Sequence, residues 1–359
     1  MTRRYRLFGA SALLLASCGG DGGGSPGSVA VVPAPTPTPA PLPAPTPSPT
    51  PSPSPTPPAP AAIEPYVLGT LSYTLAPDTP ADKARAIRAA MDFAVAHTNT
   101  LGAFTGNIWV VYGANTPTAD ASFRGQIRFG GSIGRRVALH ELAHWLGSGS
   151  VWQWSPAVAN GRFTGALVGA RIRAFDGAGA WLSADRSHFW PYGLNYDSEF
   201  SETQRNTQLV SAQVADMGIG SDATAAIGGV RRFQNRSSLF VLQGAAAGDV
   251  PIETYSVVSP AQQWRVSFAD GFVTLLNVET GLAIEAQRGG NDVPAAMATA
   301  TGAPNQQWEM MPVGEEGWFL LRNRATGNCL DNIGVLTAAA SVRLWGCGFH
   351  PNQQWRLVR

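Results

Sequence analysis

The chain has 359 residues, enough for about two domains of ~150 residues each. It holds 25 Lys and Arg against 24 Asp and Glu, and this near-neutral balance excludes a protein that binds nucleic acid through a clustered basic face. No apolar run reaches the ~18 residues that a membrane-spanning helix needs, which excludes a polytopic membrane protein.

The first 18 residues have the pattern of a secretory signal peptide, with basic residues, an apolar stretch from Leu7 to Leu15, and small residues before a cysteine. The end of this segment resembles the bacterial lipobox, which implies cleavage before Cys18 and attachment of lipid to its thiol. Acyl chains would then hold the protein on a bilayer without a spanning helix. Gly19 stands where Asp would favour inner-membrane retention, so the resemblance implies an exported protein anchored to the outer membrane of a Gram-negative bacterium. An ordinary signal peptide with an incidental cysteine is the alternative.

Residues 19–62 are predicted to be a disordered stalk. Every second residue from Pro33 to Pro57 is proline, and Asp21 is the single charged residue of the segment. Alternating prolines remove every other backbone donor, so neither a helix nor a sheet can form. Polyproline II remains, and at ~3.1 Å per residue the proline-rich part would extend roughly 80 Å.

The middle of the chain mixes helical and strand patterns. A helix is expected to begin with Thr79 as its N-cap, followed by a proline and an acidic residue in the first turn. Strands are predicted at Asn107–Tyr112 and Gly125–Phe129, and a last helix at Ser201–Met217.

Residues 137–147 carry the one motif that points to catalysis, on a predicted helix that ends at Gly147. His140 and His144 are four residues apart, so both imidazoles project from one face, as two zinc ligands require. Glu141 would lie beside the metal, where it can take a proton from zinc-bound water. Two surface histidines on an ordinary helix are the alternative.

The predicted helix, strands and motif helix resemble the N-terminal half of zincin peptidases. A catalytic zinc needs three protein ligands and an open fourth position. Metzincins place the third ligand six residues after the second histidine, where this chain has Ser150, a poor zinc ligand. Thermolysin-like enzymes use a glutamate on a following helix, and the next one here, Glu199, is too distant for the usual spacing.

Six residues remain as candidates for the third ligand. They are Asp176, Asp185, His188, Asp197, Glu199 and Glu202. We favour His188 because neutral imidazole suits zinc, with Glu199 as the next candidate. Residues 188–199 also resemble a stretch in poorly characterised bacterial secreted metallopeptidase-like proteins, some of which have lectin-type C-termini. A packed loop without a metal is the alternative.

Tyr192 and Tyr196 lie in the same segment, and either hydroxyl could donate to the oxyanion of a tetrahedral intermediate. Several tryptophans are also close in sequence. Buried packing is the default expectation for each of them, and a place along a cleft is the alternative for some. They are Trp152, Trp154, Trp181 and Trp190.

The last third of the chain contains a threefold repeat. Gln-Gln-Trp triplets recur at intervals of 44 and 47 residues, and asparagines recur at intervals of 42 and 46. The triplets are Gln262–Trp264, Gln306–Trp308 and Gln353–Trp355, and the asparagines are Asn235, Asn277 and Asn323. Short alternating strands separate them, so three all-β units must share one core.

This pattern resembles the ricin-type β-trefoil lectin domain over residues 226–359, in which each repeat is called a lobe. In that family a lobe binds sugar through an acid, an aromatic platform and an Asn-Gln pair. In lobe three these are Asp331, Trp345, Asn352 and Gln353. Cys329 and Cys347 stand at the family's disulfide positions, and an even pair in an exported chain predicts a disulfide on its own.

The other two lobes depart from the family pattern. Lobe two has Glu285 in place of the acid and Ala298 in place of the aromatic residue. Lobe one lacks the acid and the asparagine, with Val241 and Ala261 near those places. We therefore expect one sugar-binding site, with a trefoil that has lost sugar binding as the alternative.

The expected architecture is a signal peptide at 1–18, a disordered stalk at 19–62, an α+β zincin-like domain at 63–224 and an all-β trefoil at 226–359. The expected function is that of a lipid-anchored extracellular zinc metallopeptidase that cleaves protein or glycoprotein substrates and is targeted to glycans by its trefoil. Nucleic acid is not an expected partner. The alternatives are a non-enzymatic surface lectin or adhesin with a degenerate zincin domain, and a zinc amidase that acts on peptidoglycan.

Overall fold

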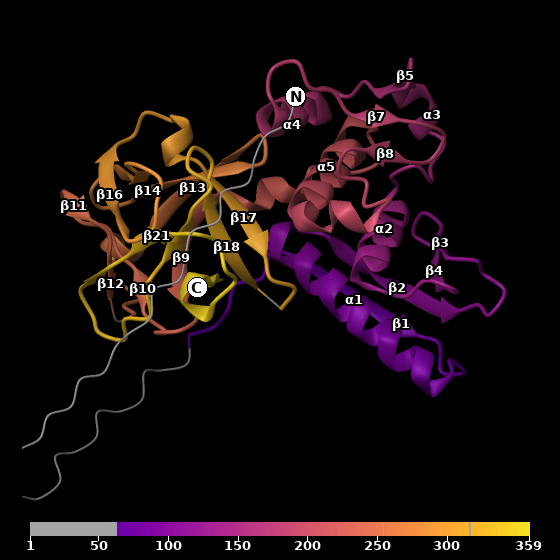
Figure 1. Cartoon of the computed structure of the whole chain (residues 1–359), viewed down its shortest axis with the longest axis horizontal. Coiled ribbons are helices and arrows are strands. Elements are labelled where there is room, and N and C mark those ends of the chain that lie inside the picture. Colours follow the sequence, from indigo (N-terminus) through magenta and orange to yellow (C-terminus); the bar gives the residue numbers. More distant parts are fainter. Residues whose placement is uncertain (1–62, 254, 316) are drawn as a thin grey trace, which may run out of the picture. The chain divides into compact units, whose positions relative to one another are not determined.

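The computed structural model describes residues 63–253, 255–315 and 317–359 (Figure 1). The expected signal peptide, its Cys18 and the expected stalk lie outside these residues. The described part belongs to one compact unit, with one hydrophobic cluster in the α/β region and another in the C-terminal strands. None of the helices in this part is long and apolar enough to cross a membrane.

The α/β region contains a four-stranded sheet in the order β1-β2-β4-β3. Its strands are β1 (Thr70–Leu75), β2 (Thr105–Tyr112), β3 (Ala119–Ala121) and β4 (Gln126–Phe129). β1, β2 and β4 run parallel, and β3 is antiparallel to β4. The two strands expected from the sequence are confirmed as β2 and β4, whereas β1 and β3 were not predicted.

Five helices accompany this sheet. They are α1 (Ala81–Leu101), α2 (Arg135–Leu146), α3 (Trp154–Ala157), α4 (Ala166–Asp176) and α5 (Thr203–Asp216), with the 3-10 helices η1 (Asp197–Glu202) and η2 (Ala223–Ile227). A small antiparallel sheet contains β5 (Val158–Ala159), β6 (Arg162–Phe163), β7 (Ser183–Ala184) and β8 (Phe189–Trp190).

The start of α1 differs from the expectation. The residue before the helix is Pro80, and no side chain caps it. The hydroxyl of Thr79 instead donates to the carbonyl of Ala76 at 2.8 Å, in the turn that precedes the helix. The predicted Thr79 cap is therefore wrong by one residue, because this hydroxyl closes the turn rather than the helix.

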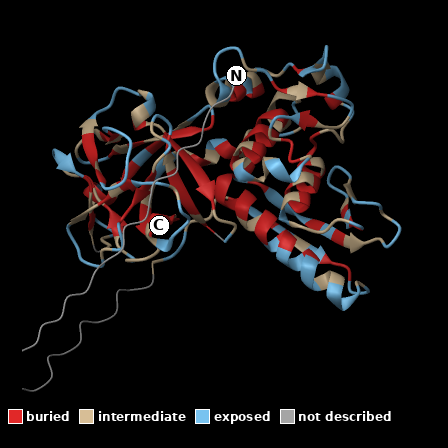
Figure 2. Ribbon diagram, viewed as in Figure 1, coloured by how far each residue is buried: buried red, intermediate tan, exposed pale blue. Residues whose placement is uncertain are grey.

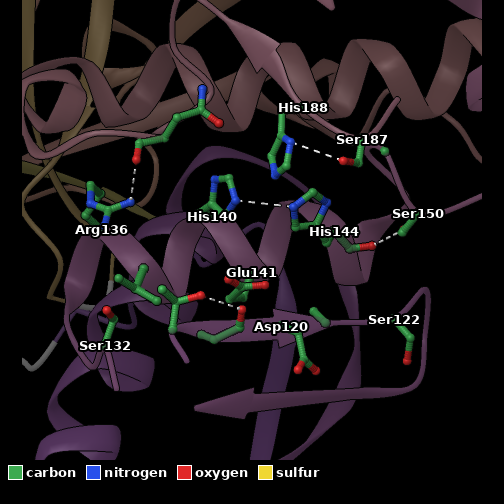
Figure 3. Close-up of a pocket in the computed structure, with 16 residues that line it drawn as sticks. Asp120, Ser122, Ser132, Arg136, His140, Glu141, His144, Ser150, Ser187 and His188 are labelled. Atoms are coloured by element: carbon green, nitrogen blue, oxygen red, sulfur yellow. Dashed lines mark hydrogen bonds between the residues drawn. The ribbon is translucent and has the colours of Figure 1, made fainter. Parts of the chain in front are cut away.

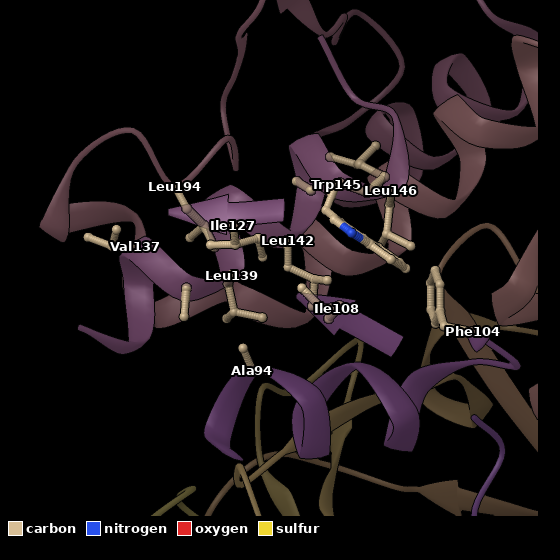
Figure 4. Packing of buried hydrophobic residues seen from close by; sticks show 14 of the residues in the cluster. Ala94, Phe104, Ile108, Ile127, Val137, Leu139, Leu142, Trp145, Leu146 and Leu194 are labelled. Atoms are coloured by element: carbon tan, nitrogen blue, oxygen red, sulfur yellow. The ribbon is translucent and has the colours of Figure 1, made fainter. Parts of the chain in front are cut away.

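α1 buries a stripe of residues at helical spacing, and its opposite side is exposed (Figure 2). The stripe is Ile87, Ala90, Met91 and Ala94. Figure 4 shows Ala94 in one cluster with Leu139 and Leu142 of α2 and with Ile108 and Ile127 of the sheet. Burial of each such leucine or isoleucine contributes about 1.5–3 kcal/mol. This packing fixes the rotation of α2, so that the face with its two histidines turns away from the core.

The C-terminal region is all-β. Its strands are β9 (Gly229–Asn235), β10 (Val241–Leu242), β11 (Gly248–Asp249), β12 (Pro251–Glu253), β13 (Trp264–Ala269), β14 (Phe272–Asn277), β15 (Leu282–Ala286), β16 (Val293–Thr299), β17 (Trp308–Pro312), β18 (Trp318–Asn323), β19 (Cys329–Asp331), β20 (Ala340–Ser341), β21 (Arg343–Trp345) and β22 (Trp355–Val358). Pairing runs in a closed ring β9-β13-β14-β17-β18-β22 and back to β9. A closed barrel with three similar lobes confirms the expected trefoil.

The three repeated tryptophans have the same role in each lobe. Trp264, Trp308 and Trp355 are fully buried. Each indole donates its one N–H to a backbone carbonyl, of Leu242, Ile284 and Leu330 respectively, at 3.0–3.3 Å. Each indole therefore fills the core with apolar surface and leaves no buried N–H without an acceptor. This explains why all three repeats retain a tryptophan.

The three repeated asparagines also act alike, because each side-chain oxygen accepts from the backbone N–H groups two and three residues later. The turn that follows has a positive φ at Gly281 in lobe two and at Gly327 in lobe three, of 70° and 72°. Leu239 takes the same place in lobe one with a φ of 61°. Lobe one therefore retains the turn geometry without the glycine that suits it.

A buried charge cluster joins α5 to the C-terminal strands. Glu309 of β17 has a side chain that is 2% exposed, and its carboxylate lies 2.9 Å from Arg205 of α5. Arg322 of β18 pairs with the same carboxylate and with Glu202. Burial alone would raise the pKa of Glu309, but the charges of Arg205 and Arg322 outweigh it and lower that pKa.

We expect Glu309→Gln to lower the free energy of unfolding by about 2–4 kcal/mol at neutral pH, because it takes the most deeply buried carboxylate from two partly buried arginines, which then share only Glu202. The folded-state pKa of Glu309 is lowered, so its contribution is present above the unfolded pKa of about 4.3 and is lost as the pH falls through the folded pKa. The stabilities of variant and wild type, measured by denaturant titration, should therefore begin to converge near the unfolded pKa and meet as the pH falls through the lowered folded-state pKa of Glu309.

Glu315→Gln is the matched control, since it removes an exposed pair with Arg236 and should change stability by at most about 1 kcal/mol. A deficit of Glu309→Gln that is equal in acid and at neutral pH would contradict the electrostatic explanation.

Candidate metal centre

Three histidines from two separate segments meet in one place (Figure 3). His140 and His144 lie on α2, and His188 immediately precedes β8. The ring centroid of His188 lies 5.5 Å from that of His140 and 5.4 Å from that of His144. Ligand nitrogens of all three lie within 4.8 Å of one another, and no other group of this kind occurs among the described residues.

Backbone carbonyls set the tautomers of the two helix histidines. His140 Nδ1 lies 2.8 Å from the carbonyl oxygen of Gly193, and His144 Nδ1 lies 2.7 Å from that of Ser148. A carbonyl can only accept, so Nδ1 is the protonated nitrogen in both rings. Each neutral ring then presents the lone pair of Nε2, the atom that a metal would take.

These two lone pairs face each other. The Nε2 atoms of His140 and His144 are 3.3 Å apart, and neither carries a hydrogen in the neutral ring. Burial and the neighbouring His144 lower the pKa of His140 to about 4, which disfavours the protonated ring near neutral pH. Converging lone pairs repel unless they share a cation, and three imidazole nitrogens form the ligand set of a catalytic zinc. The residues present therefore fit zinc.

His188 is supported on its other side. Its Nδ1 lies 3.1 Å from the hydroxyl of Ser187 and 3.7 Å from the carboxylate of Asp185. That carboxylate also accepts from the backbone N–H groups of Ser187 and His188, at 2.9 and 2.7 Å. The Ser187 hydroxyl is therefore the hydrogen-bond partner of Nδ1, while the Asp185 carboxylate holds the backbone that carries the ring.

A glycine lets the two segments approach. Gly149, just after α2, has a φ of 67°, and a Cβ at this position would lie 1.8 Å from the carbonyl oxygen of Ser187. Only glycine therefore allows the chain before His188 to pass so close to the end of α2. α2 itself ends at Gly147, with a φ of 121°, as the sequence predicts.

The other candidates for a third ligand lie elsewhere. Ser150 donates its hydroxyl to the carbonyl of His144. Asp197 pairs with Arg136, and Glu199 accepts from the N–H groups of Asn195 and Tyr196. Asp176 bonds Tyr192, Glu202 pairs with Arg322, and Asp185 stands behind His188. The structure brings only His188 to the helix histidines.

Glu141 lines the same cavity as the histidines, which has a volume of about 510 Å³. Burial raises its pKa to about 7, and the nearby charge of Asp120 adds to this rise. No hydrogen bond to another described residue occupies its carboxylate. A carboxylate with a pKa near neutrality can accept a proton and release it again, as a general base must.

The two candidate tyrosines separate in the structure. Tyr196 is 72% exposed and lines a second cavity together with His140 and His188. The Tyr192 hydroxyl donates to Asp176 and accepts from Arg205, outside both cavities. We therefore correct the prediction for Tyr192, since its hydroxyl is held by other partners, and retain Tyr196. No signal in the sequence separates Tyr192 from Tyr196, because the partner Arg205 lies on a different element, α5.

Buried packing was also expected for four tryptophans, and it is confirmed for Trp154 alone. Trp152, Trp181 and Trp190 are 79%, 50% and 45% exposed, so the expectation is wrong for these three. The indole of Trp154 donates to the carbonyl of Asp185, which helps to hold the segment before His188. Trp190 lines the second cavity beside His188 and Tyr196.

The predicted sugar-site residues of lobe three also come together. The carboxylate of Asp331 accepts from the side-chain amides of Asn352 and Gln353, at 2.5 and 2.9 Å. Trp345 is 39% exposed on β21, which pairs with the strand of Asp331. Cys329 and Cys347 form the expected disulfide.

The other lobes keep part of this arrangement. In lobe two the amide of Gln306 donates to Glu285 at 3.0 Å, the same bond that Gln353 makes to Asp331. In lobe one Gln262 donates to Gln243 at 3.2 Å. The residue of lobe one that corresponds to the acid is therefore Gln243, two residues after Val241, and it carries no charge, as the absence of an acid in this lobe predicts.

Comparison with known proteins identifies the C-terminal domain. Residues 304–359 match the model of the family described as "Ricin-type beta-trefoil lectin domain-like". No curated protein matches this chain.

Solved structures similar to part of this chain include three proteins. They are the designed threefold-symmetric protein ThreeFoil (26% identity, 36% of this chain and 98% of that one, TM-score 0.33), the Macrolepiota procera ricin B-like lectin in complex with lactose (18%, 37% and 96%, 0.33) and the Rhizoctonia solani agglutinin (22%, 36% and 94%, 0.31). The closed barrel, the repeated tryptophans and the family match together identify the C-terminal domain as a ricin-type β-trefoil lectin-like domain.

Proposed function

We propose that this protein is a zinc-dependent hydrolase that cleaves peptide bonds, with a zincin-like domain at residues 63–224. The observation that carries the proposal is the convergence of the ligand nitrogens of His140, His144 and His188 within 4.8 Å beside a buried glutamate. Bound zinc would supply a Lewis acid that activates water and polarises a carbonyl group.

The residues of the chain divide the remaining work. Glu141 would hold the proton taken from the attacking water and deliver it to the leaving amine, for which its pKa of about 7 is suited. The Tyr196 hydroxyl, at the second cavity, is the candidate donor to the developing oxyanion. The carbonyls of Gly193 and Ser148 keep the imidazoles in the ligand tautomer.

The trefoil would bind glycans through lobe three, where the Asp331 carboxylate holds two side-chain amides and Trp345 lies partly exposed on the neighbouring strand. A carboxylate accepts from paired sugar hydroxyls, and an indole covers the apolar face of a pyranose. Binding would raise the effective concentration of the enzyme on glycosylated proteins, its proposed substrates. Lipid attachment at Cys18 would hold it at the outer membrane.

We expect the purified protein to bind about one zinc ion per chain. His188→Ala should lose most of it, whereas Ser150→Ala should retain it, because the Ser150 hydroxyl bonds a backbone carbonyl instead. Metal analysis of three parallel preparations measures this. Zinc retained in His188→Ala would move the third ligand elsewhere, and a wild type without zinc even after reconstitution would favour the non-enzymatic lectin.

Glu141→Gln should retain zinc and lower the rate of casein and glycoprotein cleavage by a factor on the order of 10²–10⁴, because it removes the general base. Release of soluble fragments from purified peptidoglycan, assayed alongside, would identify the zinc amidase instead. Equal peptidase rates in variant and wild type would contradict the proposed mechanism.

Asp331→Ala should abolish retention of the protein on immobilised glycans and slow glycoprotein cleavage without affecting casein. Glu285→Ala in lobe two is the matched control and should leave both unchanged, since that lobe has no aromatic platform. Glycan arrays and the two cleavage rates measure these effects. If Asp331→Ala changes neither, the trefoil does not target the enzyme.

A further inference from the structure

The loop between β8 and η1 orients His140 through a strained backbone. Gly193, whose carbonyl accepts from the imidazole, stands between Tyr192 and Leu194, which have positive φ values of 70° and 58°. Residues with side chains rarely adopt this conformation, and it persists only where the surroundings hold it. The position of the Gly193 carbonyl therefore depends on whatever fixes its two neighbours.

α5 fixes Tyr192 at both its backbone and its side chain. The amide of Asn206 donates to the Tyr192 carbonyl at 2.7 Å, and Arg205 donates through Nη1 to the Tyr192 hydroxyl at 2.8 Å. The hydroxyl in turn donates to Asp176 at 2.6 Å. The phenol ring is thus held between one cation and one carboxylate.

Arg205 is itself aimed by the C-terminal domain. Its Nε donates to Glu309 of β17 at 2.9 Å, while its Nη1 donates to the Tyr192 hydroxyl. Because the guanidinium is planar and rigid, an acceptor fixed at Nε also fixes the direction of Nη1. Glu309 is well suited to this role, since its side chain is 2% exposed and Arg322 and Gln204 hold it from other sides.

We propose that Glu309 is a positioning residue for the metal centre. Through Arg205 and Tyr192 it fixes the Gly193 carbonyl, and with it the orientation and tautomer of His140. This inference rests on the proposed metal-binding function. It makes the C-terminal domain part of the framework of the metal centre, in addition to any role in binding glycans.

The test compares zinc dissociation constants in the full chain, measured by competition with a chromophoric chelator. Glu309→Gln and Tyr192→Phe should each weaken zinc binding about 10- to 100-fold, as is usual when support behind a ligand is removed. Arg324→Gln is the matched control: it removes a contact across the same junction, to the carbonyl of Ala174, and touches no residue of the loop. It should leave the dissociation constant unchanged.

The double variant separates a shared path from two independent effects. If Glu309 acts through Tyr192, the variant that carries both Glu309→Gln and Tyr192→Phe should have a zinc dissociation constant no higher than that of the single variant with the lower affinity. Losses that multiply, unchanged affinity in both single variants, or an equal loss in Arg324→Gln would each overturn the proposal.

Hydrogen exchange of the metal-free protein provides a readout that does not depend on zinc. Segment 189–196 should lose protection in both Glu309→Gln and Tyr192→Phe. In Tyr192→Phe, α1 and the barrel strands should keep theirs. In Glu309→Gln they should stay protected but less than in the wild type, because this variant is less stable; residual core protection shows that both variants are folded. If the wild type binds no zinc, the proposed function fails, and loop protection alone decides the inference. Unchanged protection of the loop would then overturn it.

Discussion

One hydrogen bond from each helix histidine to a backbone carbonyl is the interaction on which the candidate metal centre depends. The helical spacing of His140 and His144 places two rings on one face, but it does not decide which nitrogen of each ring is free. The carbonyls of Gly193 and Ser148 decide this, because they can only accept a hydrogen. The two Nε2 atoms then lie 3.3 Å apart with facing lone pairs, whose repulsion a bound cation would relieve.

Those carbonyls are positioned by packing at some distance from the metal centre. The apolar side of α2 packs against α1 and the sheet, and this fixes the rotation of the helix. Gly149 lets the segment of His188 pass close to the end of α2, and the buried pair of Arg205 and Glu309 supports the loop that carries Gly193. The fold thus combines an apolar framework with a few polar contacts that set directions, since hydrogen bonds are directional and apolar contacts are not.

The three lobes of the C-terminal domain share their buried structural residues and differ in their polar residues. The barrel repeats its structural residues, the tryptophans and asparagines, in all three. The residue that accepts from the first glutamine of each triplet differs among the lobes, being Gln243, Glu285 and Asp331. A shared core constrains the repeated residues, whereas a surface site can be lost from one lobe without disturbing the others.

The sequence by itself determined the elements and motifs whose signal is local: the helix with His140 and His144, the strands β2 and β4, the three Gln-Gln-Trp triplets and the disulfide of Cys329 and Cys347. It favoured His188 among six candidates for a third ligand, but only the tertiary structure brings His188 to the two helix histidines, since this depends on a close approach at Gly149. The exposure of Trp190 and the turning of Tyr192 toward Arg205 were likewise decided by tertiary contacts. Periodicity and spacing report neighbours along one element, whereas side-chain partners from separate elements are fixed only when those elements pack.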